Sequence, residues 1–206
     1  MDWTSVKHED FTDYWLNEAG GAGTSANLRN SQYSFEQQVD YLKWHMEMKK
    51  EDKVLDVGCG NGHTMLHLVG SVKEIIGIDL SPRMLKAARE EVLRLTPGSW
   101  VIGEPIDIFK TPLPYEDESF DKVYCLAVFQ YAPNINAAKF AIKEMYRVCK
   151  PEGKILVGDI FDATHLPPRP GAETFYPADL LLGYDGVAVR SNYEPFRRFD
   201  LFINKL

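Results

Sequence analysis

The stretch "VLDVGCGNG", from Val54 to Gly62, places three glycines at alternate positions directly after a short aliphatic run. Such a run predicts a buried strand that turns at its carboxyl end into a helix. Glycine adopts positive φ without steric penalty and leaves no Cβ between the backbone and a ligand. We therefore interpret Gly58, Gly60 and Gly62 as a surface for close ligand contact, which presents backbone N–H groups.

Two acidic residues accompany this turn. Asp56 lies inside the strand, where a charge is costly unless it has hydrogen-bond partners, so it either supports the turn or reaches a ligand ammonium group. Asp79 ends the next apolar run, "IGIDL", where a carboxylate can accept both hydroxyls of a ribose. The GxGxG spacing differs from the GxGxxG expected for pyrophosphate binding. The pattern thus favours a nucleoside ligand without a pyrophosphate.

Apolar segments alternate with helical patterns along residues 35–161. Strands are expected at 53–58, 74–80, 98–106, 119–129 and 154–161, and helices at 35–48, 63–72, 81–95 and 134–150. Two further strand candidates follow at 186–193 and 197–206. This order predicts an α/β fold with a doubly wound, mostly parallel sheet and helices on both faces. We expect a single domain over residues 1–206.

Composition narrows the class of protein. A net charge of −7 argues against nucleic acid as a partner, since proteins that hold a phosphate backbone normally show a basic face. No apolar run approaches the roughly 20 residues of a membrane span, and the N-terminus lacks the features of a secretory signal. Three cysteines without CxxC spacing fit reduced thiols in a cytoplasmic protein. We expect no metal, because His63 and His67 have no evident third ligand.

Four motifs, "VLDVGCGNG", "IGIDLSPRMLKAA", "FDKVYCLAVFQYA" and "RVCKPEGKILVGD", occur in this order across roughly residues 50–160. The series resembles that of the class I S-adenosylmethionine-dependent methyltransferases. The resemblance implies a seven-stranded Rossmann-like sheet with a C-terminal antiparallel hairpin. It divides the chain into an N-terminal helical cap segment (1–49), a cofactor-binding core (50–162), and an acceptor-side loop with the final hairpin (163–206). The implied cofactor is S-adenosyl-L-methionine.

The resemblance also places residues at that cofactor. They are Asp56, Gly58, Cys59, Gly60, Asp79, Leu80, Met84, Asp107, Ile108, Leu126 and Tyr33. The two glycines would line the methionine part, and Asp79 would bind the ribose hydroxyls. Leu80 and Met84 would flank the adenine, and the Leu126 backbone would face the amino acid end. Asp107 would meet the adenine amino group beside Ile108, although Glu104 is an alternative in the same loop.

Two residues are candidates for the catalytic role. Tyr131, in "VFQYAPN", matches the place where many relatives carry an active-site His or Tyr, and the histidine pair of some relatives is absent there. His165 lies in a proline-rich loop after the fifth strand, near the expected acceptor site. Tyr14, Trp15 and Tyr33 belong to the segment that folds over the cofactor in similar enzymes.

The expected activity is methyl transfer to an oxygen or nitrogen of a small-molecule acceptor by in-line displacement. Methyl transfer to protein or RNA, a nicotinamide-dependent oxidoreductase and a non-catalytic cofactor-binding module remain alternatives. The identity of the acceptor and the oligomeric state stay open.

Overall fold

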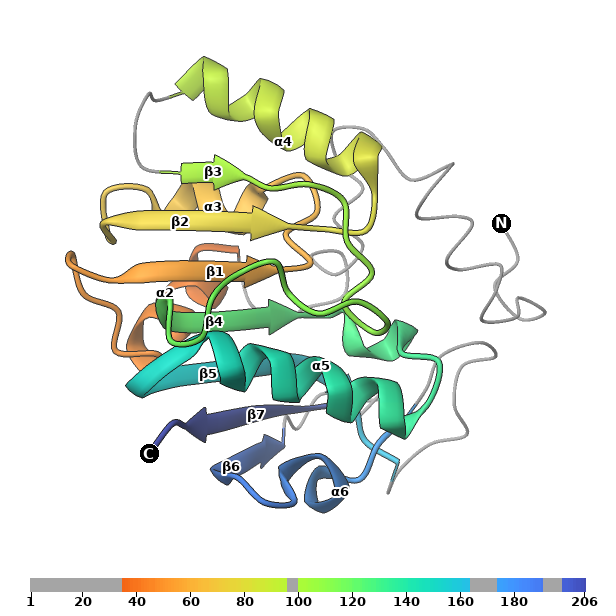
Figure 1. Ribbon diagram of the computed structural model, residues 1–206. Helices are drawn as coiled ribbons and strands as arrows, with labels where there is room; N and C mark the ends of the chain where they lie inside the picture. The colour runs from red at the N-terminus through yellow and green to blue at the C-terminus, as the bar shows by residue number, and fades with distance from the viewer. Residues whose placement is uncertain (1–34, 96–99, 164–173, 191–197) are drawn as a thin grey trace.

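The computed structural model describes residues 35–95, 100–163, 174–190 and 198–206, which form a seven-stranded sheet with helices on both faces (Figure 1). The strand order is β3-β2-β1-β4-β5-β7-β6. The pairs from β3 to β5 are parallel, whereas β7 runs antiparallel to both β5 and β6. The predicted α/β sheet with a C-terminal antiparallel hairpin is therefore confirmed.

The elements follow the expected order along the chain. The strands are β1 (Lys53–Val57), β2 (Glu74–Ile78), β3 (Trp100–Ile102), β4 (Phe120–Leu126), β5 (Cys149–Phe161), β6 (Asp185–Arg190) and β7 (Arg198–Asn204). The helices are α2 (Phe35–His45), α3 (His63–Leu68), α4 (Pro82–Leu95), α5 (Ile135–Val148) and α6 (Pro177–Leu181), with a short 3-10 helix, η3 (Phe129–Tyr131).

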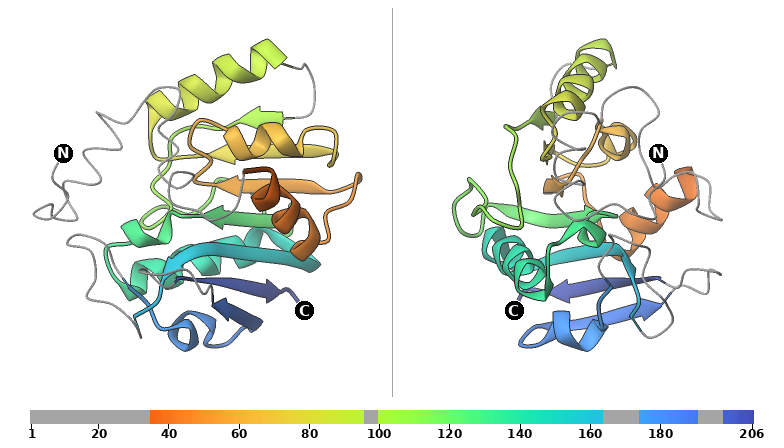
Figure 2. Two further views of the ribbon diagram at one scale, coloured as in Figure 1. Left: turned by 180° about the vertical axis from the view of Figure 1, so that it is seen from behind. Right: turned by 90° about the vertical axis from the view of Figure 1, so that its right-hand side faces the viewer.

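Helices α2 and α3 lie on one face of the sheet and α5 on the other (Figure 2). Because side chains alternate along a strand, Leu55 and Val57 of β1 pack on the α5 face, while Val54 packs with α2 and α3. Covered on both faces, β1 buries every residue after Lys53. This double burial explains why the strand appears in the sequence as a nearly unbroken apolar run.

Local sequence signals set several helix ends. Asn134 caps α5, since its Oδ1 accepts hydrogen bonds from the N–H groups of Asn136 and Ala137. The expected apolar stripe of the first helix is confirmed, because Val39, Leu42 and Met46 are all buried. These contacts fix α2 and α5 against opposite faces of the sheet.

Several predicted boundaries differ from the structure; the third strand, for example, was expected to reach residue 106 and ends at Ile102. The helix expected over 63–72 ends at Leu68, and Gly70 follows at a φ of 78°. The fifth strand begins at Cys149 rather than at residue 154. Residues 151–153, expected as a break between helix and strand, instead lie within β5, where the Glu152 N–H donates to the Lys205 carbonyl. A contact with the far end of the chain thus extends the strand.

In the part of the chain that the structure describes, no helix combines the length and apolar character needed to cross a membrane.

Candidate functional site

The glycine turn sits at the carboxyl end of β1, between the ends of β2 and β4. The N–H groups of Gly58 and Cys59 both donate to the Ile78 carbonyl, at 2.7 and 2.9 Å, which ties the turn to β2. Gly58 has a φ of 81°, and a Cβ there would lie 2.3 Å from Cγ2 of Val128. Position 58 therefore requires glycine both for its backbone conformation and for the close approach of the segment after β4.

The N–H groups of the turn donate hydrogen bonds within the protein. Beyond the two bonds to Ile78, the Gly60 N–H donates to Oδ2 of Asp79 at 2.9 Å, and the Gly62 N–H donates to the Cys59 carbonyl at 3.0 Å. The expectation that these N–H groups are presented to a ligand is therefore wrong, because the Ile78 carbonyl, the Asp79 carboxylate and the Cys59 carbonyl accept them. The Cα face of Gly60 is open, since a Cβ there would meet only Cε of Met84, at 3.7 Å.

Asp79 joins the end of β2 to the glycine turn. Its Oδ2 accepts from Gly60, and its Oδ1 accepts from the Ser81 N–H at 2.8 Å. Burial raises the pKa of the Asp79 carboxyl, and the hydrogen bonds from Ser81, Gly60 and Leu80 oppose that rise. Two carboxylate oxygens offer about four acceptor positions, so this side chain keeps capacity for ligand hydroxyls.

Asp56 lies beneath the turn and is 3% exposed. Its Oδ2 accepts a hydrogen bond of 2.7 Å from the Tyr124 hydroxyl, so the buried acid has the partner that its position requires. Burial raises the pKa of Asp56 to about 7, and the negative charge of Asp79 adds to the rise, whereas the Tyr124 hydrogen bond opposes it. The sequence analysis missed Tyr124, because a tyrosine inside an apolar strand looks like any other core aromatic.

The loop between β3 and β4 lies next to Asp79, whose carbonyl accepts the Ile106 N–H at 2.9 Å. Asp107 follows, and its carboxylate accepts from the Phe109 N–H and pairs with Lys110 at 3.1 Å. Ile108 is buried in the core on the α5 face. The alternative acid, Glu104, has an 89% exposed side chain that pairs with Arg89. The structure thus brings Asp107 into the neighbourhood of Asp79 and leaves Glu104 largely in solvent.

The carboxyl ends of β4 and β5 form the other half of this sheet edge. Ala127, directly after Leu126, has a φ of 58°, and Asp159 in β5 has a φ of 63°. The two sites are joined, because the Ala127 N–H donates to the Gly158 carbonyl at 3.0 Å. Positive φ is costly for residues with a side chain and clusters at functional sites. Tyr131 lies close by in sequence, at the end of η3.

Side chains from distant segments tie down the β5 end. The Asp159 N–H donates to Oδ1 of Asp200 at 2.7 Å, and the Tyr41 hydroxyl of α2 donates to Oδ2 of Asp200 at 3.0 Å. The Asp159 carboxylate forms an ion pair with Arg198, whose guanidinium lies over the Phe161 ring. None of these residues was a candidate, since they meet only through the pairing of β5 with β7 and the contact of α2 with β7.

The family model of the methyltransferase domain matches residues 55–157, half of the chain, from β1 into β5. The chain belongs to the methyltransferase domain family. This match confirms the family that the four sequence motifs resembled, and it spans the glycine turn, Asp79 and the end of β4.

Two curated relatives and one solved structure illustrate the similarity. The probable methyltransferase ltbC of Aspergillus luteorubrus is 38% identical over 129 residues, 59% of this chain and 44% of that protein. A demethylmenaquinone methyltransferase of Staphylococcus carnosus is 35% identical over 136 residues, 63% of this chain and 53% of that protein. The chain therefore spans about half the length of these relatives.

The solved structure is that of the N-methyltransferase NodS from Bradyrhizobium japonicum in complex with S-adenosyl-L-homocysteine. It superposes with a TM-score of 0.70 at 20% identity and covers 97% of this chain and 99% of that chain. This likeness confirms the class I methyltransferase fold.

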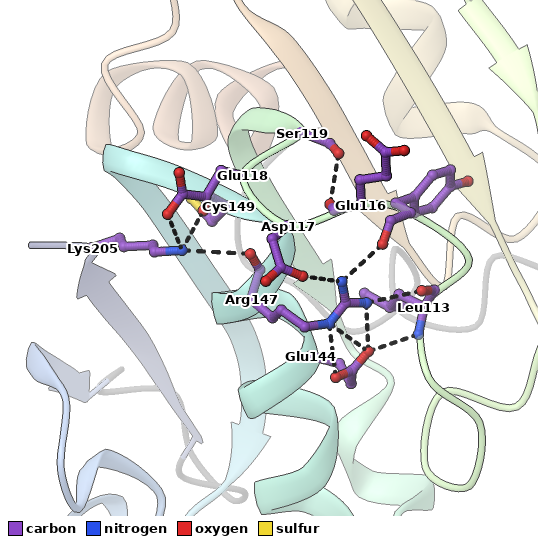
Figure 3. Close-up of polar contacts among 10 residues, drawn as sticks. Leu113, Glu116, Asp117, Glu118, Ser119, Glu144, Arg147, Cys149 and Lys205 are labelled. Carbon is purple, nitrogen blue, oxygen red and sulfur yellow. Dashed lines mark hydrogen bonds and ion pairs between the residues drawn. The ribbon is translucent and has the colours of Figure 1, made fainter.

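In this methyltransferase domain, Arg147 of α5 fastens the loop between β3 and β4 (Figure 3). Its guanidinium donates to the carbonyls of Leu113 and Tyr115, at 2.9 and 2.8 Å, and to the Asp117 carboxylate at 2.8 Å. It also bonds Glu144, whose Oε2 accepts the Leu113 N–H at 2.9 Å. We name Glu144 and Arg147, with the loop atoms they bind, the Arg147 latch.

Electrostatics favour the charged form of both latch residues. Arg147 holds the pKa of Glu144 below its ordinary value, and Glu144 and Asp117 raise the pKa of Arg147. The latch therefore holds the loop that carries Asp107 onto α5. A glutamate and an arginine three positions apart on an amphipathic helix were a signal for such a pair, but their loop partners were not visible in the sequence.

The structure gathers most of the predicted cofactor residues at one edge of the sheet. Those around the turn and the end of β2 are Asp56, Gly58, Cys59, Gly60, Asp79, Leu80 and Met84, with Asp107 and Ile108 in the adjoining loop and Leu126 at the end of β4. Tyr33 and His165 lie outside the described residues, as do Tyr14 and Trp15. All three cysteines, Cys59, Cys125 and Cys149, are free and buried.

Proposed function

We propose that this chain transfers a methyl group from S-adenosylmethionine to an oxygen or nitrogen atom of a small-molecule acceptor by in-line displacement. The observation that carries the proposal is the pair of carboxylates, Asp56 and Asp79, on either side of a bare glycine turn. A ligand with a sulfonium, an ammonium group and a free ribose gains from two nearby negative charges. A ligand that presents a pyrophosphate is repelled by them.

The internal bonding of the turn supports the same choice over a nicotinamide-dependent oxidoreductase. Pyrophosphate sites hold the phosphate with free backbone N–H groups at the start of a helix. Here the N–H groups of Gly58, Cys59, Gly60 and Gly62 are already bonded within the protein. The open Cα face of Gly60 beside Met84 fits an uncharged adenosyl group instead.

Each residue near the turn receives a defined task in this proposal. Asp79 accepts the ribose hydroxyls, and Asp56 faces the ammonium of the methionine part. Leu80 and Met84 flank the adenine, while Asp107 accepts from its amino group. The cofactor supplies a methyl group already activated by its positive sulfur. The main task left to the protein is orientation of the acceptor, for which Tyr131 and His165 are our candidates.

The acceptor class rests on charge and on the relatives. A net charge of −7 disfavours RNA as the substrate, and we propose a cytoplasmic enzyme that acts on a small molecule. Among the relatives, one is named for demethylmenaquinone, and the superposed structure is an N-methyltransferase. A screen of metabolite pools with labelled cofactor would identify the compound that gains the methyl group.

The proposal predicts a large effect at Asp79. Asp79→Ala removes hydrogen bonds to a charged group, worth about 1.5–3 kcal/mol each, so we expect at least a roughly tenfold weaker affinity for S-adenosylhomocysteine. Isothermal titration calorimetry measures it. Asp185→Ala, at an exposed position on β6, is the control and should bind like the wild type. An unchanged affinity in Asp79→Ala would remove Asp79 from the site.

A further inference from the structure

A tyrosine hydroxyl is buried beneath the glycine turn. Tyr124 of β4 pairs in register with Asp56 of β1, and its side chain is fully buried in the core layer that also holds Met65 and Leu68 of α3. A phenol in such surroundings needs a hydrogen-bond partner, and the Asp56 carboxylate provides it at 2.7 Å. The hydroxyl therefore determines how this carboxylate is held.

The hydrogen bond distinguishes the two carboxylate oxygens. Tyr124 donates to Oδ2, and within the described part of the chain Oδ1 accepts no hydrogen bond. Asp56 is only two residues before Gly58, where the turn begins. A carboxylate oxygen that accepts no hydrogen bond from the described residues is a suitable acceptor for a ligand cation.

We propose that Tyr124 is a positioning residue that holds Asp56 by Oδ2 and thereby presents Oδ1 to the ammonium group of the adenosyl sulfonium cofactor. The inference rests on the proposed function and adds to it a residue that does not touch the ligand. It also makes cofactor binding depend on the protonation state of Asp56, because an ammonium group pairs with the ionised acid and not with the neutral one.

The surroundings of Asp56 place this dependence on protonation in a pH range that can be measured. Burial raises the pKa of Asp56 to about 7, so the acid is partly protonated at neutral pH. Its titratable neighbours are Asp79 at the end of β2, Cys59 in the turn, and Tyr124 and Cys125 in β4. Burial raises the pKa of both thiols well above the ordinary value, and it also raises the pKa of the Asp79 carboxyl.

The affinity for the cofactor is expected to fall in acid. The ammonium group selects ionised Asp56, so affinity falls as the pH drops below about 7, by up to tenfold per pH unit. The Tyr124 hydrogen bond lowers the pKa of Asp56, and Tyr124→Phe removes it. In the variant, the loss of affinity should therefore begin at a higher pH, by about one unit, and the deficit relative to wild type should grow as the pH falls, towards about tenfold.

The experiment is calorimetric titration of the full chain with S-adenosylhomocysteine from pH 5.5 to 8.5, in wild type and Tyr124→Phe. We expect binding of the variant to be about tenfold weaker at pH 5.5, roughly fivefold weaker at pH 7 and nearly unchanged at pH 8.5. A deficit of the same factor at every pH would show a packing role and overturn the proposal, as would two identical profiles. Failure of the wild type to bind at any pH would instead reject the proposed function.

A second measurement keeps the test independent of the folding of Tyr124→Phe. Titrations of the wild type at pH 7 in buffers of different ionisation enthalpy count the protons released on binding. We expect about half a proton from Asp56, and about half a proton less release in Asp56→Asn, which has no carboxyl group at this position to ionise. Equal proton release by the two proteins would overturn the proposal.

Discussion

The two halves of the functional edge are built in different ways. At the ends of β1 and β2, positive φ falls on glycines 58, 60 and 62. At the ends of β4 and β5 it falls on Ala127 and Asp159, which carry side chains. The N–H groups of the glycine turn bond within residues 58–81, and Tyr124 of β4 adds one distant partner at Asp56, whereas the second half depends on Asp200 and Tyr41 from distant segments. The half at the ends of β1 and β2 is thus largely a local motif, and the half at the ends of β4 and β5 is assembled by tertiary contacts.

The largest predicted effect tests how rigidly the local motif is set. In Gly58→Ala, the positive φ costs about 1–2 kcal/mol and the overlap with Val128 about 1–3 kcal/mol. We expect the free energy of unfolding to fall by roughly 2–5 kcal/mol in denaturant titrations.

Gly70→Ala is the matched control for this prediction. Its φ of 78° is nearly the same, but a Cβ there would meet no atom within 4 Å. We expect only the backbone cost of about 1–2 kcal/mol. Equal losses in the two variants would show that contact with the β4 end contributes nothing at position 58.

A smaller effect is expected from the Arg147 latch, a long-range contact that holds the loop between β3 and β4. Arg147→Met leaves Glu144, a buried acid, without its charged partner. Breaking a buried pair costs about 3–5 kcal/mol, and we expect roughly 2–3 kcal/mol because Arg147 is partly exposed. Denaturant titration gives the free energy of unfolding.

The double variant Glu144→Gln/Arg147→Met separates charge from packing in the latch. Removing the unpaired buried charge should restore part of the lost stability, since replacing both partners of an ion pair is milder than removing one. A double variant less stable than Arg147→Met would contradict the ion-pair explanation and assign the latch to shape alone.

The same division explains what the sequence could predict. The order of strands and helices, the glycine turn and Asp79 were predictable because each depends on hydrophobic periodicity or on residues within one strand–turn–helix unit. The partners of Asp56, Asp159 and Arg147 were not, since Tyr124, Asp200 and Leu113 join them through strand pairing or loop packing. The internal use of the turn N–H groups was missed because the Ile78 carbonyl reaches them only in the folded sheet.

The smallest predicted effect concerns Ala127, at the end of β4, and tests the same comparison between the two halves of the sheet edge. Ala127→Gly is the reverse of the Gly58 substitution, and three terms of similar size act on it. Relief of positive φ stabilises the variant by about 1–2 kcal/mol. Loss of a buried methyl group costs about 0.8 kcal/mol, and the greater freedom of glycine in the unfolded chain costs about 0.4–1 kcal/mol. We expect the free energy of unfolding to stay within about 1 kcal/mol of wild type. If the free energy of unfolding fell by more than about 2 kcal/mol, the packing of the Ala127 methyl group would outweigh its backbone strain. The ends of β4 and β5 would then be packed as tightly as the glycine turn, and the contrast between the two halves would be wrong.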